Sequence, residues 1–366
     1  MTLWAFWLTL LTTACLSVGL ALLLGPLARR GRLLDEPGGR KVHDAPTPLT
    51  GGPALLITVL AVGTWWLPVD RFMQALLAGG LLLFLAGLID DRRHLAAGLR
   101  FLVQVSACLI MIFWAELRLD DFGRLLWNDV LELGWLAVPI TIFAALGVIN
   151  AFNMIDGMDG LAGSIFLVAA IGMAMFAGLG GDWRMVWLLL LCSAAVSGFL
   201  LLNARLPWNP RARLFLGDSG SMLLGFVLAW CFIALGNDQP YTSGRSFMPI
   251  TAVWLFAVPL LDTTAQIWRR WRAGLSAFEA DQCHLHHAFL RAGFSVRQTW
   301  LAISLLALLL AAIGVVLEFS ALPGYVSFWL FMAFACAYYN YMRRSWEIQR
   351  FLGRGLIYND FQPPQP

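Results

Sequence analysis

Several acidic residues stand at the ends of apolar segments, where they could bind a metal ion. Asp90 and Asp91 are adjacent and close the apolar run GLIDD. Two carboxylates at a helix C-terminus face the negative end of the helix dipole, which is unfavourable without a compensating charge. A divalent cation would supply that charge. For this pair alone, a solvated helix end with Arg92 and Arg93 as local partners is the alternative.

A second acidic group lies in the segment NAFNMIDGMDGL. Asp156 and Asp159 are three residues apart, so they share one face of a helix or tight turn, and Asn153 precedes them by one turn. Gly157 and Gly160 let the backbone or a ligand approach closely. A plain connector would not need two carboxylates without any Lys or Arg, so the segment favours a functional loop.

The third group is LFLGDSGS, in which Gly217 and Asp218 open an apolar helix. A helix N-terminus attracts anions through its free backbone N–H groups. Together with the carboxylate of Asp218, this suits a metal-bound phosphate. Ordinary N-capping by Asp218 or Ser219 is the alternative.

Three of the five histidines are gathered in the fourth group, DQCHLHH. Three His in four residues could ligate zinc, although adjacent His286 and His287 seldom bind one metal ion together. With Arg291 downstream, His284, His286 and His287 suit a diphosphate better, through donated hydrogen bonds. A solvated polar loop is the alternative.

Two further features involve charged residues. Arg40 and Lys41 form a basic stretch before PTPLTGG, where a topological signal is the alternative to substrate binding. Asp262 lies inside an apolar segment, and an ionisable residue at membrane depth is a functional candidate by default. It stands about two turns from Arg269, so the sequence leaves open an ion pair or a position at the floor of the site.

The composition indicates that these apolar segments lie in a membrane. The 366 residues are 60% hydrophobic and 13% charged, with a mean hydropathy of +0.73, whereas soluble domains have about 25% charged residues. The net charge of +3 is too small to indicate nucleic acid. We therefore expect an all-α integral membrane protein with about eleven transmembrane helices, at residues 3–28, 50–69, 71–89, 99–117, 135–152, 161–180, 185–203, 219–236, 248–268, 299–317 and 324–342.

The basic residues predict the orientation of these helices. Of the 25 Lys and Arg, 20 fall on the side that holds residues 29–49, 90–98, 204–218, 269–298 and the C-terminal tail. That side is predicted to be cytoplasmic, with the N-terminus periplasmic and the C-terminus cytoplasmic. All four motifs then lie at the cytoplasmic face. Residues 1–342 are expected to form one transmembrane catalytic domain and 343–366 a cytoplasmic tail.

Carboxylates, histidines and arginines on one face favour phosphoryl transfer, which needs a metal ion to hold phosphate oxygens and a positioned nucleophile. Hard oxygen donors suit Mg²⁺ or Mn²⁺. A secondary transporter of an anionic solute is the competing hypothesis. It would require ionisable residues near the midplane and inverted repeats, but no repeat is visible.

In combination, NAFNMIDGMDGLAG, LGDSGS, the Asp90–Asp91 pair and HLHH resemble the polyprenyl-phosphate N-acetylhexosamine-1-phosphate transferase superfamily. The resemblance extends over almost the whole chain. HLHH, the eleventh helix and Asp262 in PLLD favour the branch of undecaprenyl-phosphate N-acetylglucosaminyl-1-phosphate transferases. That branch starts O-antigen (lipopolysaccharide) and related glycan synthesis at the bacterial inner membrane.

The resemblance implies that UDP-GlcNAc and undecaprenyl phosphate react to give GlcNAc-diphospho-undecaprenol and UMP. UDP-MurNAc-pentapeptide or another UDP-N-acetylhexosamine is the alternative donor, and a homodimer is possible. Direct attack by the lipid phosphate is favoured, with a covalent aspartyl-phosphate on Asp156 left open. The implied catalytic residues are Asp90, Asp91, Asp156 and Asp159, the metal ligands Asp218, Asp90 and Asp91, and the substrate-binding residues Arg40, Lys41, Asn153, Gly217, His284, His286, His287 and Arg291.

Overall fold

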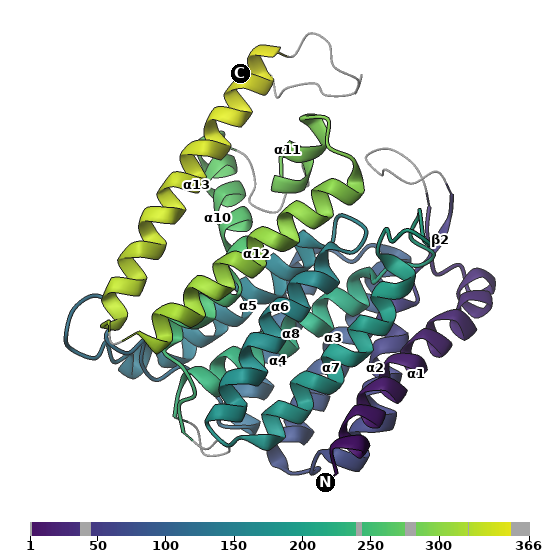
Figure 1. Cartoon of the computed structure of the whole chain (residues 1–366), viewed down its shortest axis with the longest axis horizontal. Coiled ribbons are helices and arrows are strands. Elements are labelled where there is room, and N and C mark those ends of the chain that lie inside the picture. The colour runs from purple at the N-terminus through teal and green to yellow at the C-terminus, as the bar shows by residue number, and fades with distance from the viewer. Residues whose placement is uncertain (1, 37–44, 239–243, 275–282, 321, 353–366) are drawn as a thin grey trace.

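The computed structural model is an all-helical bundle with a single two-stranded ribbon among the residues it describes (Figure 1). These residues are 2–36, 45–238, 244–274, 283–320 and 322–352. The bundle begins with α1 (Leu3–Arg30), the antiparallel strands β1 (Leu34–Asp35) and β2 (Thr47–Pro48), α2 (Gly51–Trp66), α3 (Arg71–Arg93) and α4 (Ala97–Leu109), which continues into the π-helical turn η1 (Ile110–Trp114). It goes on with η2 (Gly134–Leu136), α5 (Ala137–Ile155), α6 (Leu161–Leu179), α7 (Trp183–Asn203), α8 (Gly217–Gly236), α9 (Pro249–Leu255), α10 (Ala257–Arg272), α11 (Leu285–Arg291), α12 (Val296–Phe319) and α13 (Gly324–Leu352).

Helix α8 forms the centre of the bundle. It packs against α2, α3, α5 and α6. In its most apolar stretch of 18 residues, 94% are buried. A helix that is apolar on all sides belongs in the interior of such a bundle. Around Trp230, the rings of Phe72 and Phe226 pack edge-on, with centroids 5.0 and 5.7 Å away. This central helix carries Asp218 at its first turn, so the position of that carboxylate is fixed by the whole core.

The lengths and compositions of the helices agree with the predicted all-α membrane protein. Each of the eleven predicted segments coincides with helical structure. Among the described residues, eight helices are both long and apolar enough to cross a bilayer, and the bent pair α9–α10 would make a ninth. Helix α2 has 16 residues, fewer than the roughly 20 needed to cross the hydrocarbon at a right angle. Helix α13 continues past residue 342 to Leu352, so the predicted tail begins as helix.

The predicted membrane span at residues 248–268 is not one continuous helix. The chain forms α9 and α10 there, and they meet at an angle of 84°. Pro259 lacks the N–H that would bond to the carbonyl of Leu255, and its ring crowds that carbonyl. Accordingly, α9 ends at Leu255 and a new helix begins at Ala257. The bend directs α10 toward α11 and α13, which carry other parts of the site (Figure 1).

Candidate active site

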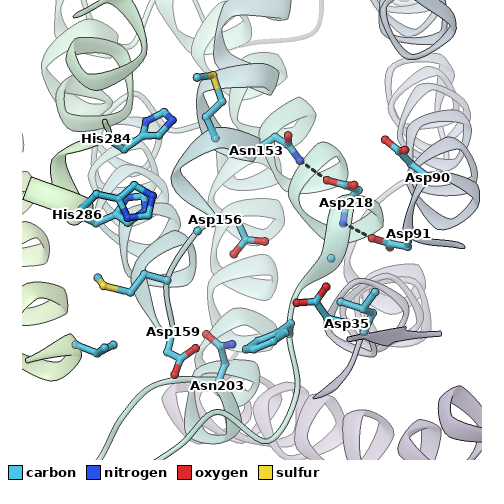
Figure 2. Close-up of a pocket in the computed structure, with 18 of the residues that line it drawn as sticks. Asp35, Asp90, Asp91, Asn153, Asp156, Asp159, Asn203, Asp218, His284 and His286 are labelled. Atoms are coloured by element: carbon cyan, nitrogen blue, oxygen red, sulfur yellow. Dashed lines mark hydrogen bonds between the residues drawn. The ribbon is translucent and has the colours of Figure 1, made fainter. Parts of the chain in front are cut away.

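A cavity of about 440 Å³ opens where the ends of several helices meet, at the end of the bundle opposite the N-terminus (Figures 1 and 2). All four motifs predicted to share one side of the membrane contribute to it. Six aspartates and one arginine line it. They are Asp35, Asp90, Asp91, Asp156, Asp159 and Asp218, with Arg205, and His94, Asn153, Asn203, Gly217, His284, His286 and His287 complete its polar lining.

The first turn of α8 is held by Asp91. Its two carboxylate oxygens accept hydrogen bonds from the backbone N–H groups of Asp218 and Ser219, at 2.7 and 3.2 Å. Gly217, the first residue of α8, has φ +75°, and a Cβ there would lie 2.8 Å from Oδ2 of Asp91. Only glycine meets both conditions without strain. Asp91 therefore acts as the N-terminal cap of α8 from another helix.

Close backbone packing fixes the same turn from α2 and from α3, the helix that carries Asp91. A Cβ on Gly52 of α2 would lie 2.6 Å from the backbone nitrogen of Gly220. A Cβ on Gly87 of α3 would lie 2.5 Å from the Cα of Ser219. The segment PTPLTGG thus ends in residues that let α2 approach α8. The predicted substrate-binding residues before it, Arg40 and Lys41, lie outside the described residues.

Asn153 connects the last turn of α5 to Asp218. Its Nδ2 donates to Oδ1 of Asp218 at 2.7 Å and to Oγ of Ser221 at 2.8 Å (Figure 2). The structure thus brings together Asn153 and Asp218, two residues of separate predicted motifs that are 65 residues apart in the chain. The second carboxylate oxygen of Asp218 receives no hydrogen bond from the described residues and remains available to a ligand.

Asp156 projects into the middle of the cavity. Figure 2 shows it between the histidines on one wall and Asp218 on the other. The described residues donate no hydrogen bond to its carboxylate. Withdrawal from water raises the pKa of Asp156 well above its ordinary value, and the nearby carboxylates of Asp218 and Asp91 raise that pKa further. A cation bound beside Asp156 would therefore stabilise its ionised carboxylate.

Asp159 is instead neutralised by the protein. Its Oδ2 accepts a hydrogen bond from Nε of Arg205 at 2.7 Å, and both side chains are largely buried. Beside this pair, Asn203 accepts from the backbone N–H of Gly160 at 2.8 Å and donates to the carbonyl of Leu214 at 2.9 Å. Sequence reasoning missed Asn203, the last residue of α7, and Arg205, which stands between α7 and LGDSGS.

Asp90 is 3% exposed, with its carboxylate already satisfied by protein. It accepts hydrogen bonds from the backbone N–H of Leu95 at 2.7 Å and from Arg100 at 3.1 Å. The local partners weighed from the sequence, Arg92 and Arg93, are not the ones it uses. Asp90 lines the cavity, but as part of an ion pair with Arg100.

The histidine motif forms the opposite wall. His284 directs Nδ1 to Oδ2 of Asp262 at 2.8 Å, and His286 lies 2.9 Å from where a Cβ on Gly157 would be. Burial lowers the pKa of His286 well below its ordinary value, and the neighbouring His287 lowers it further. His286 is therefore neutral at pH 7. Its Nδ1 is buried and finds no hydrogen-bond partner among the described residues.

Arg291 is the one predicted substrate-binding residue within the described ranges that does not line the cavity. It stands at the C-terminal end of α11. Two further polar side chains of the cavity that sequence reasoning missed are those of Asp35 and His94. Asp35 belongs to a two-residue strand and His94 to the turn after α3, and neither position carries a periodic or motif signal.

The donor set suits one class of metal ion. No three His, Cys, Asp or Glu side chains in the described part of the chain are placed to hold one ion together, so these residues provide no zinc site of the usual kind. Mg²⁺ binds through one or two carboxylates, with waters and substrate phosphates completing its shell. Asp156 and the unoccupied oxygen of Asp218 fit that requirement.

Known proteins resemble this chain over most of its length. Residues 73–236 match glycosyl transferase family 4. The undecaprenyl-phosphate alpha-N-acetylglucosaminyl 1-phosphate transferase of Escherichia coli (strain K12) is 35% identical over 334 residues, which cover 90% of this chain and 88% of that protein. The proteins of the same name from Yersinia pestis and Haemophilus influenzae are 35% and 34% identical, over 88% and 91% of this chain and 87% and 93% of their own lengths. With its acidic cavity built from the matched helices α3, α5 and α8, the chain belongs to glycosyl transferase family 4.

Proposed function

We propose that this protein transfers N-acetylglucosamine 1-phosphate from UDP-GlcNAc to undecaprenyl phosphate, forming GlcNAc-diphospho-undecaprenol and UMP. The observation that carries the proposal is the cavity that joins Asp218, Asn153 and Asp156 to the histidine motif. The E. coli relative, which matches 90% of the chain, is named undecaprenyl-phosphate alpha-N-acetylglucosaminyl 1-phosphate transferase. A phosphoryl-transfer site needs positioning and charge neutralisation more than covalent chemistry.

We further propose that the site binds Mg²⁺ or Mn²⁺, held by Asp218 and Asp156. When bound, the ion neutralises the phosphate oxygens of the donor and stabilises the charge that develops during transfer. The raised pKa of Asp156 supports this assignment, because an unpaired carboxylate among other carboxylates is stabilised by a cation. Asp91 contributes by holding the backbone of Asp218.

In the reaction, an oxygen of the lipid phosphate attacks the β-phosphorus of UDP-GlcNAc. A new P–O bond forms to the lipid phosphate, and the bond between the β-phosphorus and the bridging oxygen breaks to release UMP. The lipid phosphate is already an anion at neutral pH, so a strong base is not required. The chain's own residues bind and orient the donor, with Arg205 and His287 on the cavity wall as hydrogen-bond donors.

The proposal places the cavity at the cytoplasmic face of the bacterial inner membrane. The excess of Lys and Arg on that side supports this orientation, since five of the 25 basic residues fall on the other side. An N-terminus in the periplasm, eleven crossings and a cytoplasmic C-terminus follow from it, with α9–α10 counted as one bent crossing.

A transfer assay in detergent tests the function. The purified protein is supplied with radiolabelled UDP-GlcNAc and undecaprenyl phosphate, and labelled lipid is separated from the nucleotide. We expect labelled lipid and UMP in equal amounts, and none in excess EDTA until Mg²⁺ or Mn²⁺ is restored. Full activity in excess EDTA would contradict the metal role. Transfer only from UDP-GalNAc or UDP-MurNAc-pentapeptide would change the donor, and no lipid product from any of them would refute the enzyme.

A further inference from the structure

Asp262 is a buried carboxylate that the proposed reaction has not yet used. It belongs to α10 and is 2% exposed. Burying a carboxylate is costly unless its oxygens are hydrogen-bonded. Three donors serve Asp262, namely Nδ1 of His284 at 2.8 Å, the backbone N–H of Leu285 at 2.9 Å and the hydroxyl of Tyr338 at 3.2 Å. The ion pair with Arg269 that the sequence left open is not formed.

The two oxygens of Asp262 have different partners. Oδ2 meets the ring of His284, whereas Oδ1 accepts from the backbone of Leu285 and from Tyr338 on α13. One oxygen therefore anchors the chain, and the other orients an imidazole. This division allows the two roles to be separated by substitution.

The contact with Oδ2 determines which nitrogen of His284 faces the cavity. A carboxylate only accepts hydrogen bonds, so it holds a proton on Nδ1 and leaves Nε2 for other partners. His284 lines the cavity, and its ring points into it in Figure 2. The ring also stacks on His286, with centroids 5.7 Å apart and planes 8° from parallel.

We propose that Asp262 is a positioning residue for the transfer reaction, which fixes the orientation and the Nδ1–H form of His284 so that the unprotonated Nε2 faces the donor and accepts a hydrogen bond from its sugar. This assignment rests on the proposed function. Asp262 itself does not touch the substrate, because His284 lies between it and the cavity. The bend after α9 contributes, since it brings α10 beneath the histidine motif.

Asp262→Asn isolates the orienting contact. The backbone N–H of Leu285 can only donate, so it keeps the amide oxygen of the new side chain on its side and turns the NH₂ group toward His284. That NH₂ group can only donate to Nδ1, which forces the ring proton onto Nε2. Asp262→Asn should therefore change the tautomer of His284 while the anchoring bonds to Leu285 and Tyr338 remain.

The first experiment reads the tautomer directly. Protein labelled with ¹⁵N-histidine has five imidazoles, and His284→Gln identifies the signals of His284 in the NMR spectrum. We expect a protonated Nδ1 in the parent and a protonated Nε2 in Asp262→Asn. A neutral Nε2–H ring in the parent, or the same ring state in both proteins, would overturn the proposal. This reading does not depend on activity, so it stands even if the proposed function fails.

The second experiment asks whether Asp262 acts through His284. Asp262→Asn should lower kcat of transfer by about 100-fold or more, the range of a misplaced proton-bearing group, with a much smaller change in KM for UDP-GlcNAc. The double variant Asp262→Asn with His284→Ala should be no slower than His284→Ala alone. Independent, multiplying losses would show that Asp262 acts otherwise, and unchanged kcat in Asp262→Asn would exclude a positioning role.

A matched control lies two residues further along the same helix. Thr264 is exposed, and its hydroxyl bonds only to the helix backbone at Leu260 and Leu261. Thr264→Val should keep parental kcat and thermal stability. If the parent protein shows no transfer, the proposed function is contradicted. The NMR experiment would still show whether Asp262 sets the tautomer of His284.

Discussion

Nδ2 of Asn153 lies 2.7 Å from Oδ1 of Asp218, so one hydrogen bond joins the last turn of α5 to the first turn of α8. The same amide group reaches Ser221 at 2.8 Å. This bond fixes which oxygen of Asp218 is engaged with protein and which oxygen faces the cavity. A partner that orients a metal-binding carboxylate commonly matters nearly as much as the ligand itself.

Asn153→Ala should lower transfer activity by about 10- to 100-fold, the usual effect of losing such an orienting partner. Asp218→Asn should abolish turnover. Asn150 provides the matched control, since it lies one turn earlier on α5 and bonds to Gln104 outside the cavity. Initial rates of Asn150→Ala should stay within a few-fold of the parent. Near-normal turnover in Asp218→Asn would remove this residue from the metal site.

Gly217 is predicted to tolerate no side chain, because a Cβ would clash with Asp91. This clash can be measured separately from the cost of the left-handed backbone. Gly217→Ala adds the cost of a left-handed residue, about 1–2 kcal/mol, and a clash with Asp91, whose Oδ2 would lie 2.8 Å from the new Cβ. Gly181 has a similar φ of +78° but open space around it. Gly181→Ala should lose only the backbone part, as measured by thermal unfolding, and keep its activity. Equal losses in the two variants would contradict a tight contact at Gly217.

Asp156 should make the protein less stable as pH rises. Its pKa is raised in the folded state, so the protonated form is favoured by folding. The resulting stabilisation is present below the pKa of the unfolded chain and is lost as pH rises through the higher folded value. Asp156→Asn cannot ionise and should therefore unfold at a higher temperature than the parent at pH 7–8, while losing activity.

The same variant tests whether Asp156 meets a cation. Mg²⁺ should raise the unfolding temperature of the parent at pH 7–8, because a ligand bound only by the folded state stabilises it. That increase should be smaller in Asp156→Asn. If Mg²⁺ stabilises both proteins equally, Asp156 is not a ligand, and a parental pH profile in the variant would contradict its raised pKa.

Arg205 is the single arginine that lines the cavity within the described ranges, and its Nε is paired with Asp159. Its terminal amino groups are suited to the donor's phosphates, since guanidinium binds phosphate in a two-pronged manner. Arg205→Ala should raise KM for UDP-GlcNAc about tenfold or more, with a smaller change in kcat. Arg213, from the same segment, bonds to Asn209 outside the cavity. Arg213→Ala should leave KM unchanged, and equal KM values in all three proteins would exclude Arg205 from donor binding.

The sequence by itself determined the membrane class, the helical segments and the motifs that would share one end of the bundle. These follow from composition, from runs of about 20 apolar residues and from the distribution of Arg and Lys. Composition, apolar runs and charge distribution are local or additive properties of the sequence. Each can be determined without knowing which helices are in contact. That Asp218 and Asn153 lie on the same side follows from their places at predicted helix ends, whereas their hydrogen bond is known only from the structure.

Only the tertiary structure decided what each carboxylate does. Asp91 caps α8 because Gly217 and Gly87 let two helices approach within contact of a backbone, and sequence spacing does not encode that distance. Arg205 neutralises Asp159 across 46 residues, so Asp156 is left as the unpaired acid. Asp262 reaches His284 because α10 bends away from α9. Charge at a site depends on which groups meet, and long-range packing alone determines those meetings.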